Sequence, residues 1–144
     1  MFLRNFSHVP DDKLTWTPTP TSKSALRIAA HAAVTNGNFA DMIRNRKLPM
    51  GDEIPDFMAR NSATEAAITS REEMERVFRE NTQKVLDALD TLTDDDLEIV
   101  LDSGQGWTMS MAYLTRLPGW HATLHTGQID FLQTCWDDQQ IYVG

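Results

Sequence analysis

The stretch Gly119–Gln128, with the sequence GWHATLHTGQ, carries two of the four histidines in this chain of 144 residues. His121 and His125 are four residues apart. In an α-helix that spacing places two side chains on one face, about 6 Å apart along the axis. The two imidazoles can therefore bind one metal ion, or they can be core histidines that share a helix face. A third ligand from another segment would favour the metal site.

His31 is the candidate for this third ligand. It lies in the apolar run Ile28–Val34, near the middle of a helix that is predicted to begin after Ser22 or Ser24 and to end near Lys47. A histidine in such a run can be a core residue that is satisfied by one hydrogen bond. It can also be a ligand, because neutral imidazole binds zinc, nickel and non-haem iron, and three imidazoles leave coordination positions open.

The segments on either side of this helix are predicted to be connections. Residues 10–22 contain three prolines, which exclude a helix there and favour an extended chain. Residues 48–63 are expected to form a second connection, with Pro55 in its middle.

Two further helices are predicted. Ser70 and Glu73 form a capping box, and the helix that it opens should end near Thr91. The last helix is expected to run from about Thr108 to Trp136, with a kink or break at Pro118–Gly119 because proline lacks a backbone donor.

These elements predict one domain over residues 1–144, because strand signals are nearly absent and helices follow one another. The expected fold class is all-α, an up-down four-helix bundle with a short first helix, since Met1–His8 offers only about two turns. Such a short segment would leave apolar faces of the other helices partly uncovered. We therefore expect a homodimer or a larger assembly.

Composition limits the partners of this chain. A net charge of −8 repels phosphate backbones and anionic lipid, so we expect neither nucleic acid nor a membrane as a partner. The single cysteine, Cys135, excludes an internal disulfide framework and a CxxC motif. No apolar segment reaches the roughly 18 residues of a membrane span, and Met1–Pro10 lacks the apolar run of a signal peptide. A cytoplasmic location is expected.

The order of these features resembles the DinB/YfiT-like superfamily of metal-binding four-helix bundles. The resemblance covers nearly the whole chain and is carried by a proline-rich lead-in with Trp16-Thr17-Pro18, a histidine on the second helix, a capped third helix and a closing HxxxHxGQ element. It implies that His31, His121 and His125 bind a divalent transition metal, which could be zinc, nickel or iron.

The resemblance also implies a function. Relatives include metal-dependent transferases and isomerases that use low-molecular-weight thiols such as bacillithiol or mycothiol. We therefore expect a metal-dependent enzyme that activates a thiol or water to act on a small molecule, and a thiol S-transferase is the specific expectation. The alternative is a stress-associated helical bundle that binds a metal or a ligand without turnover. No catalytic residue is assigned.

Four polar residues are candidates for the surroundings of the metal. Gln128 lies in the turn after His125, where it can orient an imidazole through a hydrogen bond or serve in helix packing. Asn38 lies two turns beyond the histidine of the second helix, and Asn81 and Thr82 interrupt the apolar stripe of the third. None of these side chains is a good general base, which favours a substrate thiol as the nucleophile.

Overall fold

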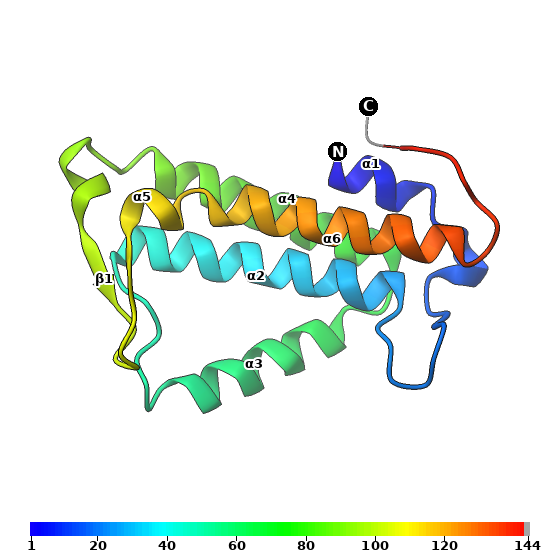
Figure 1. Ribbon diagram of the computed structural model, residues 1–144, viewed down its shortest axis with the longest axis horizontal. Coiled ribbons are helices and arrows are strands. Elements are labelled where there is room, and N and C mark those ends of the chain that lie inside the picture. The colour runs from blue at the N-terminus through cyan, green and yellow to red at the C-terminus, as the bar shows by residue number, and fades with distance from the viewer. Residues whose placement is uncertain (143–144) are drawn as a thin grey trace.

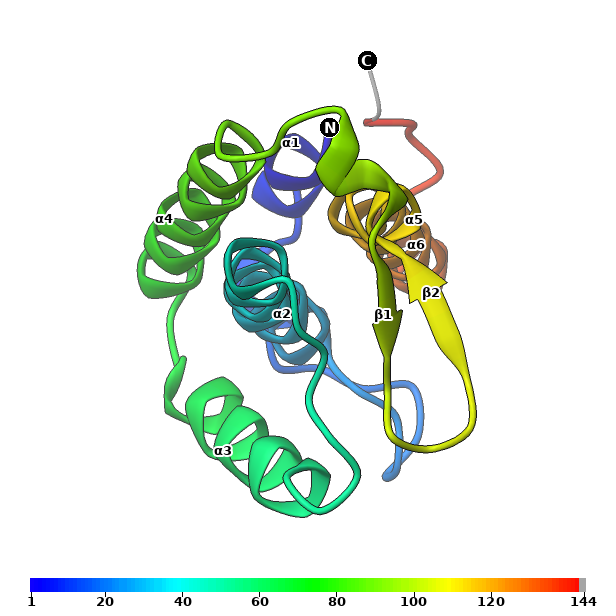
Figure 2. The ribbon, with the colours of Figure 1, turned by 90° about the vertical axis from the view of Figure 1, so that its left-hand side faces the viewer.

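Helices dominate the computed structural model, which describes residues 1–142, and this mostly helical character agrees with the sequence prediction. Helices α2 (Ala25–Asn45), α4 (Arg71–Leu89) and α6 (Leu117–Thr134) lie side by side along the long axis of the molecule (Figure 1). Helix α1 (Phe2–Ser7) lies between α4 and α6 at one end (Figure 2).

No helix within residues 1–142 is long and apolar enough to cross a membrane. The remaining elements are the 3-10 helices η1 (Asp11–Lys13) and η2 (Asp95–Glu98), the helices α3 (Ile54–Ala67) and α5 (Met111–Leu114), and the strands β1 (Val100–Asp102) and β2 (Thr108–Ser110).

Serine residues cap the N-termini of the long helices α2 and α4. The Ser24 side chain accepts a hydrogen bond from the backbone N–H of Arg27 at 3.3 Å, and Ser70 accepts one from Glu73 at 3.2 Å. Each serine satisfies a donor that the first turn of a helix leaves without an intrahelical partner. Helices α2 and α4 therefore begin where the sequence predicts, and each ends within two residues of its predicted end.

The short first helix covers one half of the core. Phe2 stacks on Phe78 of α4, with 4.6 Å between the ring centroids, and Phe6 is fully buried. Asn5 donates a hydrogen bond to Asp130 of α6. Helix α1 has about two turns, as predicted, and these contacts tie it to both of the helices between which it lies.

A β-hairpin and α5 cover the other half of the core. Strands β1 and β2 pair antiparallel, with Leu101 opposite Met109. Leu101 packs in a second apolar cluster with Met111 and Leu114 of α5 and Val85 of α4. The hairpin and α5 lie at the end of the molecule that α1 is too short to reach (Figure 1).

Residues 48–63 are not the simple connection that the sequence predicts. Helix α3 begins at Ile54 and carries Pro55 in its first turn. A proline there costs no hydrogen bond, because the N–H groups of the first turn have no intrahelical partner. The helix packs on α2, and none of residues 54–67 is buried. The prediction of a connection over residues 48–63 is therefore wrong from Ile54 onward.

The predicted helix over residues 108–136 is interrupted as well. Residues 108–110 form β2, Ser110 caps α5 by accepting a backbone hydrogen bond at 3.1 Å, and α6 begins only at Leu117. Pro118 lies in the first turn of α6, where proline is tolerated, so the break precedes it. The hairpin corrects the prediction of a purely helical chain, because strands of three residues are too short to show an alternating pattern.

Candidate metal centre

The packing of α6 on α2 brings the three predicted ligands together. One ring nitrogen from each of His31, His121 and His125 can be chosen so that all three atoms lie within 4.8 Å of one another. The Nε2 atoms of His121 and His125 are 3.0 Å apart. The ring centroid of His31 lies 5.1 Å from that of His121 and 5.0 Å from that of His125. The three histidines are thus positioned to bind one metal ion.

Burial keeps two of these imidazoles neutral. The pKa of His121 falls from 6.5 to about 4, chiefly because burial penalises the charged ring and further because His125 and His31 are close. Burial is also the main cause that lowers the pKa of His125, which is 7% exposed. Neutral imidazole is the form that binds a metal, so these two ligands need to lose no proton at neutral pH.

Hydrogen bonds to the outer ring nitrogens orient two of the ligands. Nδ1 of His31 lies 2.7 Å from Oε1 of Glu65 on α3, and Nδ1 of His125 lies 2.7 Å from Oε1 of Gln128. Both oxygens are acceptors, so each Nδ1–H donates and the ring lone pair remains on Nε2. Partners of this kind fix the tautomer and the orientation of a metal-binding imidazole and raise its basicity.

Glu65 is a residue of the site that sequence reasoning missed. Its side chain is 18% exposed. The guanidinium of Arg27 holds the end of α3 in place by donating to the backbone carbonyls of Glu65 and Ile68, each at 2.5 Å. A helix signal was present, because residues 56–67 contain four alanines and neither glycine nor proline. A helix assigned there would have carried this carboxylate as a candidate partner for a histidine.

Packing orients the third ligand. Nδ1 of His121 is buried and makes no hydrogen bond within residues 1–142. The ring of Phe39 lies edge-on to the His121 ring, with 5.6 Å between centroids. A donor set of three imidazoles fits zinc, nickel or iron, and within the described part of the chain the cluster includes no fourth protein ligand. Three protein ligands leave coordination positions for water or a substrate.

Two of the predicted pocket residues lie away from this centre. Asn81 donates to the carbonyl oxygen of Ala33 at 2.9 Å, and Thr82 accepts a hydrogen bond from Asn36 at 3.1 Å. At 100° per residue, Ala33 and Asn36 lie roughly 140° to 160° around α2 from His31. Asn81 and Thr82 therefore line the contact of α2 with α4 and not the metal centre.

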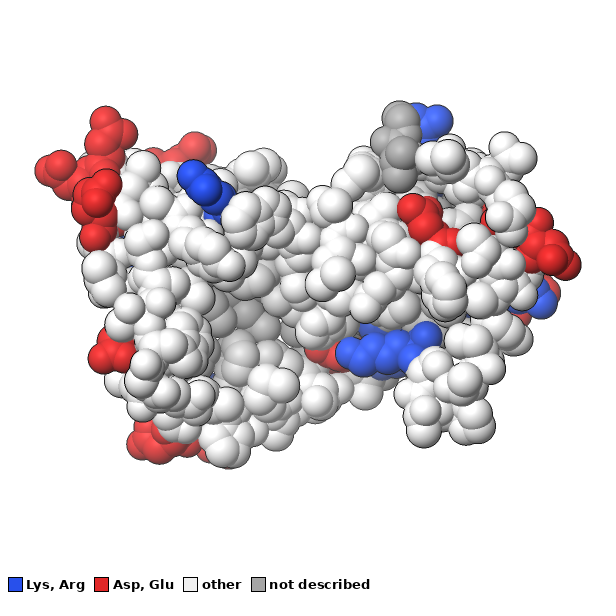
Figure 3. Space-filling view, in the orientation of Figure 1, with Lys and Arg blue, Asp and Glu red and all other residues white. Residues whose placement is uncertain are grey.

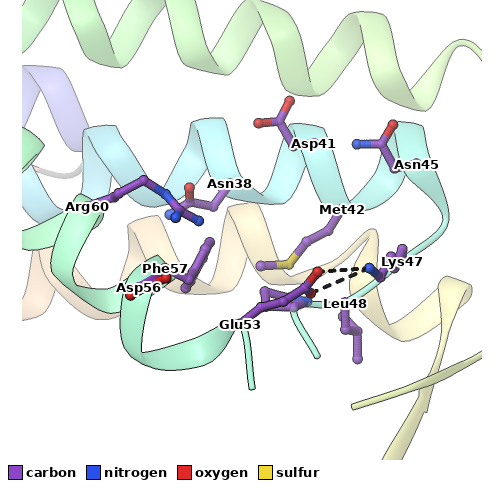
Figure 4. Close-up of a pocket in the computed structure, with 11 residues that line it drawn as sticks. Asn38, Asp41, Met42, Asn45, Lys47, Leu48, Glu53, Asp56, Phe57 and Arg60 are labelled. Atoms are coloured by element: carbon purple, nitrogen blue, oxygen red, sulfur yellow. Dashed lines mark hydrogen bonds and ion pairs between the residues drawn. The ribbon is translucent and has the colours of Figure 1, made fainter. Parts of the chain in front are cut away.

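Asn38 is on the same side of α2 as the metal centre, but two turns further along. It donates to Asn61 of α3 at 3.1 Å and lines a cavity of about 420 Å³ between α2 and α3. Figure 4 shows this cavity with Lys47 paired to Glu53, at 3.2 Å. Other charged side chains surround it, namely Asp41, Asp56 and Arg60. Asn38 thus lines a charged cavity rather than the centre itself.

A second cavity, of about 260 Å³, opens beside the metal centre. Phe39, whose ring contacts His121, lines it, and so does Leu117, one turn before His121 on α6. All of its lining side chains are apolar, and they come from α2, α3, the hairpin region, α5 and α6. Figure 3 shows the surface hollowed between α6, α3 and the hairpin, with uncharged walls. We call this cavity the apolar groove.

These observations define a mostly helical protein with a three-histidine centre where two helices meet. The sequence profile of the DinB superfamily matches residues 1–129, and the chain belongs to this superfamily. The structure is similar to the crystal structure of a DinB-like protein, YjoA, from Bacillus subtilis, with a TM-score of 0.68, 16% sequence identity, and coverage of 97% of this chain and 86% of that chain. At that identity the likeness shows the fold alone. A comparison with curated protein sequences found no match.

Substitution of Glu65 tests how the centre is built. We expect Glu65→Ala to weaken Zn²⁺ binding by about 10- to 100-fold, because the orienting acceptor of His31 is lost. His31→Ala should abolish stoichiometric binding. Isothermal titration calorimetry on metal-free protein measures both effects. The exposed residues Glu72 and His8 provide matched alanine controls, which should bind with unchanged affinity. Tight stoichiometric binding by His31→Ala would refute the ligand assignment.

Acid should destabilise the metal-free protein through its buried histidines. The pKa of His121 is about 4 in the folded chain against an ordinary 6.5, so between these values the unfolded chain binds more protons. The free energy of unfolding should therefore be level above about pH 6.5 and fall as the pH decreases toward 4. The carboxyl of Asp96, whose pKa the Arg46 guanidinium lowers to about 2, contributes only at lower pH.

Urea unfolding between pH 7.5 and pH 4.5, in the presence of a chelator, measures this decline. His121→Gln should make the decline shallower without abolishing it, because glutamine does not titrate but His125 still does, and His8→Gln is the control that should leave the decline unchanged. If the free energy of unfolding of His121→Gln falls with decreasing pH as steeply as that of the unaltered protein, other groups cause the acid sensitivity.

Proposed function

We propose that this chain is a metal-dependent enzyme that transfers a low-molecular-weight thiol to a small electrophile. The observation that carries the proposal is the centre itself, in which three imidazoles converge and the described residues offer no fourth ligand. Structural zinc sites are closed by four protein ligands, whereas catalytic sites keep one position for water or substrate. Membership of the DinB superfamily supports this reading, since the resemblance in sequence implies thiol-dependent relatives.

The metal and the protein side chains would contribute different parts of the thiol transfer. A divalent ion at this centre would supply Lewis acidity, which lowers the pKa of a thiol or water that reaches it. The protein keeps His121 and His125 neutral and orients His31 through Glu65. In the transfer, the thiol proton passes to solvent, and the sulfur forms a bond to the electrophilic carbon. The bond from that carbon to the leaving group breaks, and its electron pair departs with the leaving group.

The surrounding side chains favour a thiol over water as the nucleophile. Hydrolysis calls for a general base near the attacking water. The carboxylate that contacts a histidine of the centre is that of Glu65, and it is engaged with Nδ1 of His31. Ala122 follows His121, at the position where the HExxH metalloprotease motif has its glutamate. A thiol that has lost its proton needs no further base.

A conjugation assay tests this function. Protein loaded with Zn²⁺, Ni²⁺ or Fe²⁺ is incubated with bacillithiol, mycothiol or cysteine and a panel of electrophiles that includes 1-chloro-2,4-dinitrobenzene. Mass spectrometry quantifies the S-conjugate. We expect acceleration for at least one pair of thiol and metal, with loss of the acceleration on chelation and in His121→Ala but not in His8→Ala. Stoichiometric metal binding without acceleration for any pair would favour the bundle without turnover.

We also propose that the helices form an up-down four-helix bundle, with α1 as its short member, and that two copies associate through the outer face of α6. Trp120, Leu124 and Phe131 are 52%, 60% and 65% exposed and lie at helical spacing. A cavity of about 660 Å³ lies over Leu124 and Phe131. A Cβ atom at Gly127 would meet no atom within 4 Å, so a second backbone has room to approach.

Charge supports a second copy as the occupant of this face. A chain with net charge −8 repels another copy over much of its surface. The face over α6 carries few charged side chains (Figure 3). A two-fold contact of this stripe with itself would bury apolar area without bringing like charges together.

Light scattering at micromolar concentration tests the dimer. We expect twice the chain mass for the unaltered protein and a monomer for Leu124→Asp, because a symmetric contact would bury two added charges without partners. Leu86, which is 50% exposed on α4, provides the control: Leu86→Asp should remain a dimer. A monomer mass for the unaltered protein would show that this proposal is wrong.

A further inference from the structure

We propose that the apolar groove binds an uncharged alkyl or aryl group of the substrate, so that the electrophile acted on by this protein is hydrophobic. The inference rests on the proposed function, because it takes the three histidines as the place of reaction. It adds the chemical class of the substrate and the side chains that select it.

The groove adjoins the metal centre through Phe39. The ring of Phe39 lines the groove and lies 5.6 Å from the His121 ring, between centroids. Leu117 lines the groove one turn before His121 on α6, which corresponds to about 6 Å along the helix axis. A group that fills the groove beside Phe39 and Leu117 therefore lies within one side chain of His121.

The walls of the groove select an uncharged group. Its lining includes Met42 of α2, Phe57 of α3 and Met109 of β2, and among the described residues it includes no charged side chain and no polar group other than the indole N–H of Trp107. A charged or hydrogen-bonding group placed there would lose its water without gaining a partner, which is unfavourable. Carboxylates, lysine and arginine lie instead around the neighbouring cavity of Figure 4, which shares Met42, Leu48, Pro49 and Phe57 with the groove.

Two apolar side chains of the groove lining, from α3 and from the hairpin loop, are largely exposed to solvent. Met58 of α3 is 56% exposed and Trp107 of the hairpin loop is 48% exposed, and both line the groove. No residue of α3 is buried, so a bound apolar group would complete the packing of α3 against the rest of the protein. Binding of an apolar group in the groove is favoured because it removes apolar area of both the group and the groove from water.

The size of the groove limits the occupant to a small molecule. Its volume is about 260 Å³. An apolar cavity of about 150 Å³ holds a benzene molecule. The groove therefore accommodates roughly one substituted aromatic ring or an alkyl chain of six to eight carbons.

A homologous series of n-alkyl hydroxamates, from acetyl to decanoyl, tests the proposal. The hydroxamate group binds divalent metals and the alkyl tail reaches into the groove. With Zn²⁺-loaded protein and isothermal titration calorimetry, we expect the dissociation constant to fall by about three- to fourfold for each added methylene group, as expected for burial in an apolar site. The gain should end at six to eight carbons, when the groove is full.

Matched variants assign the gain to the groove. Met58→Asp adds a charge to its wall at an exposed position and should remove most of the dependence on chain length. Ala59→Asp adds the same charge to the next residue of α3, which does not line the groove, and should leave the dependence intact. The fluorescence of Trp107 gives a second readout, because a tail beside the indole should change its emission, and this change should be absent in Trp107→Phe.

A parallel titration of metal-free protein with n-alkanols separates the groove from the metal. If acetohydroxamate binds but longer tails add nothing, the groove proposal is wrong and the metal centre stands. If no hydroxamate binds Zn²⁺-loaded protein while alkanol affinity rises with chain length and Met58→Asp abolishes the rise, the groove stands and the proposed function fails. A flat alkanol series together with a flat hydroxamate series would overturn the groove proposal.

Discussion

The contact between α2 and α6 is the constraint on which the candidate site depends. It places His31 against His121 and His125 in a partly buried setting, where burial and the neighbouring rings lower the pKa of His121 and of His125. The histidines of α6 are therefore held in the neutral form that binds metals. Glu65 and Gln128 complete the arrangement, because each accepts a hydrogen bond from an outer ring nitrogen and leaves an Nε2 lone pair available.

The rest of the fold keeps this contact in place by covering the long helices with two unlike pieces. Helix α1 and its phenylalanines cover one end of the long helices, and the hairpin with α5 covers the other. On α6, Leu117 belongs with the second apolar cluster and Ile129 with the first, so the histidines lie between the two. The three histidines therefore separate the two apolar clusters, and each cluster keeps its own buried residues.

Helix α3 has no buried residue, and its two ends make different contacts with the candidate site and the cavities. Arg27 holds its C-terminal carbonyls, which keeps Glu65 at hydrogen-bonding distance from His31. Its N-terminal half borders the apolar groove and the charged cavity, through Phe57, which lines both. A helix that packed tightly along its whole length would close both cavities.

The sequence by itself determined the helix caps and the spacing of the two histidines on α6, because these depend only on residues that are close along the chain. The caps at Ser24 and Ser70 and the spacing of His121 and His125 follow from hydrogen bonding within one turn and from the helical period, so they could be predicted. Only the tertiary structure decided which polar side chains reach the centre. Glu65 does so from another helix, whereas Asn81 and Thr82, which an apolar stripe alone could not orient, face the other side of α2. Strands β1 and β2 are likewise decided by the tertiary structure, because each is extended through its pairing with the other and three residues are too few to show a strand pattern.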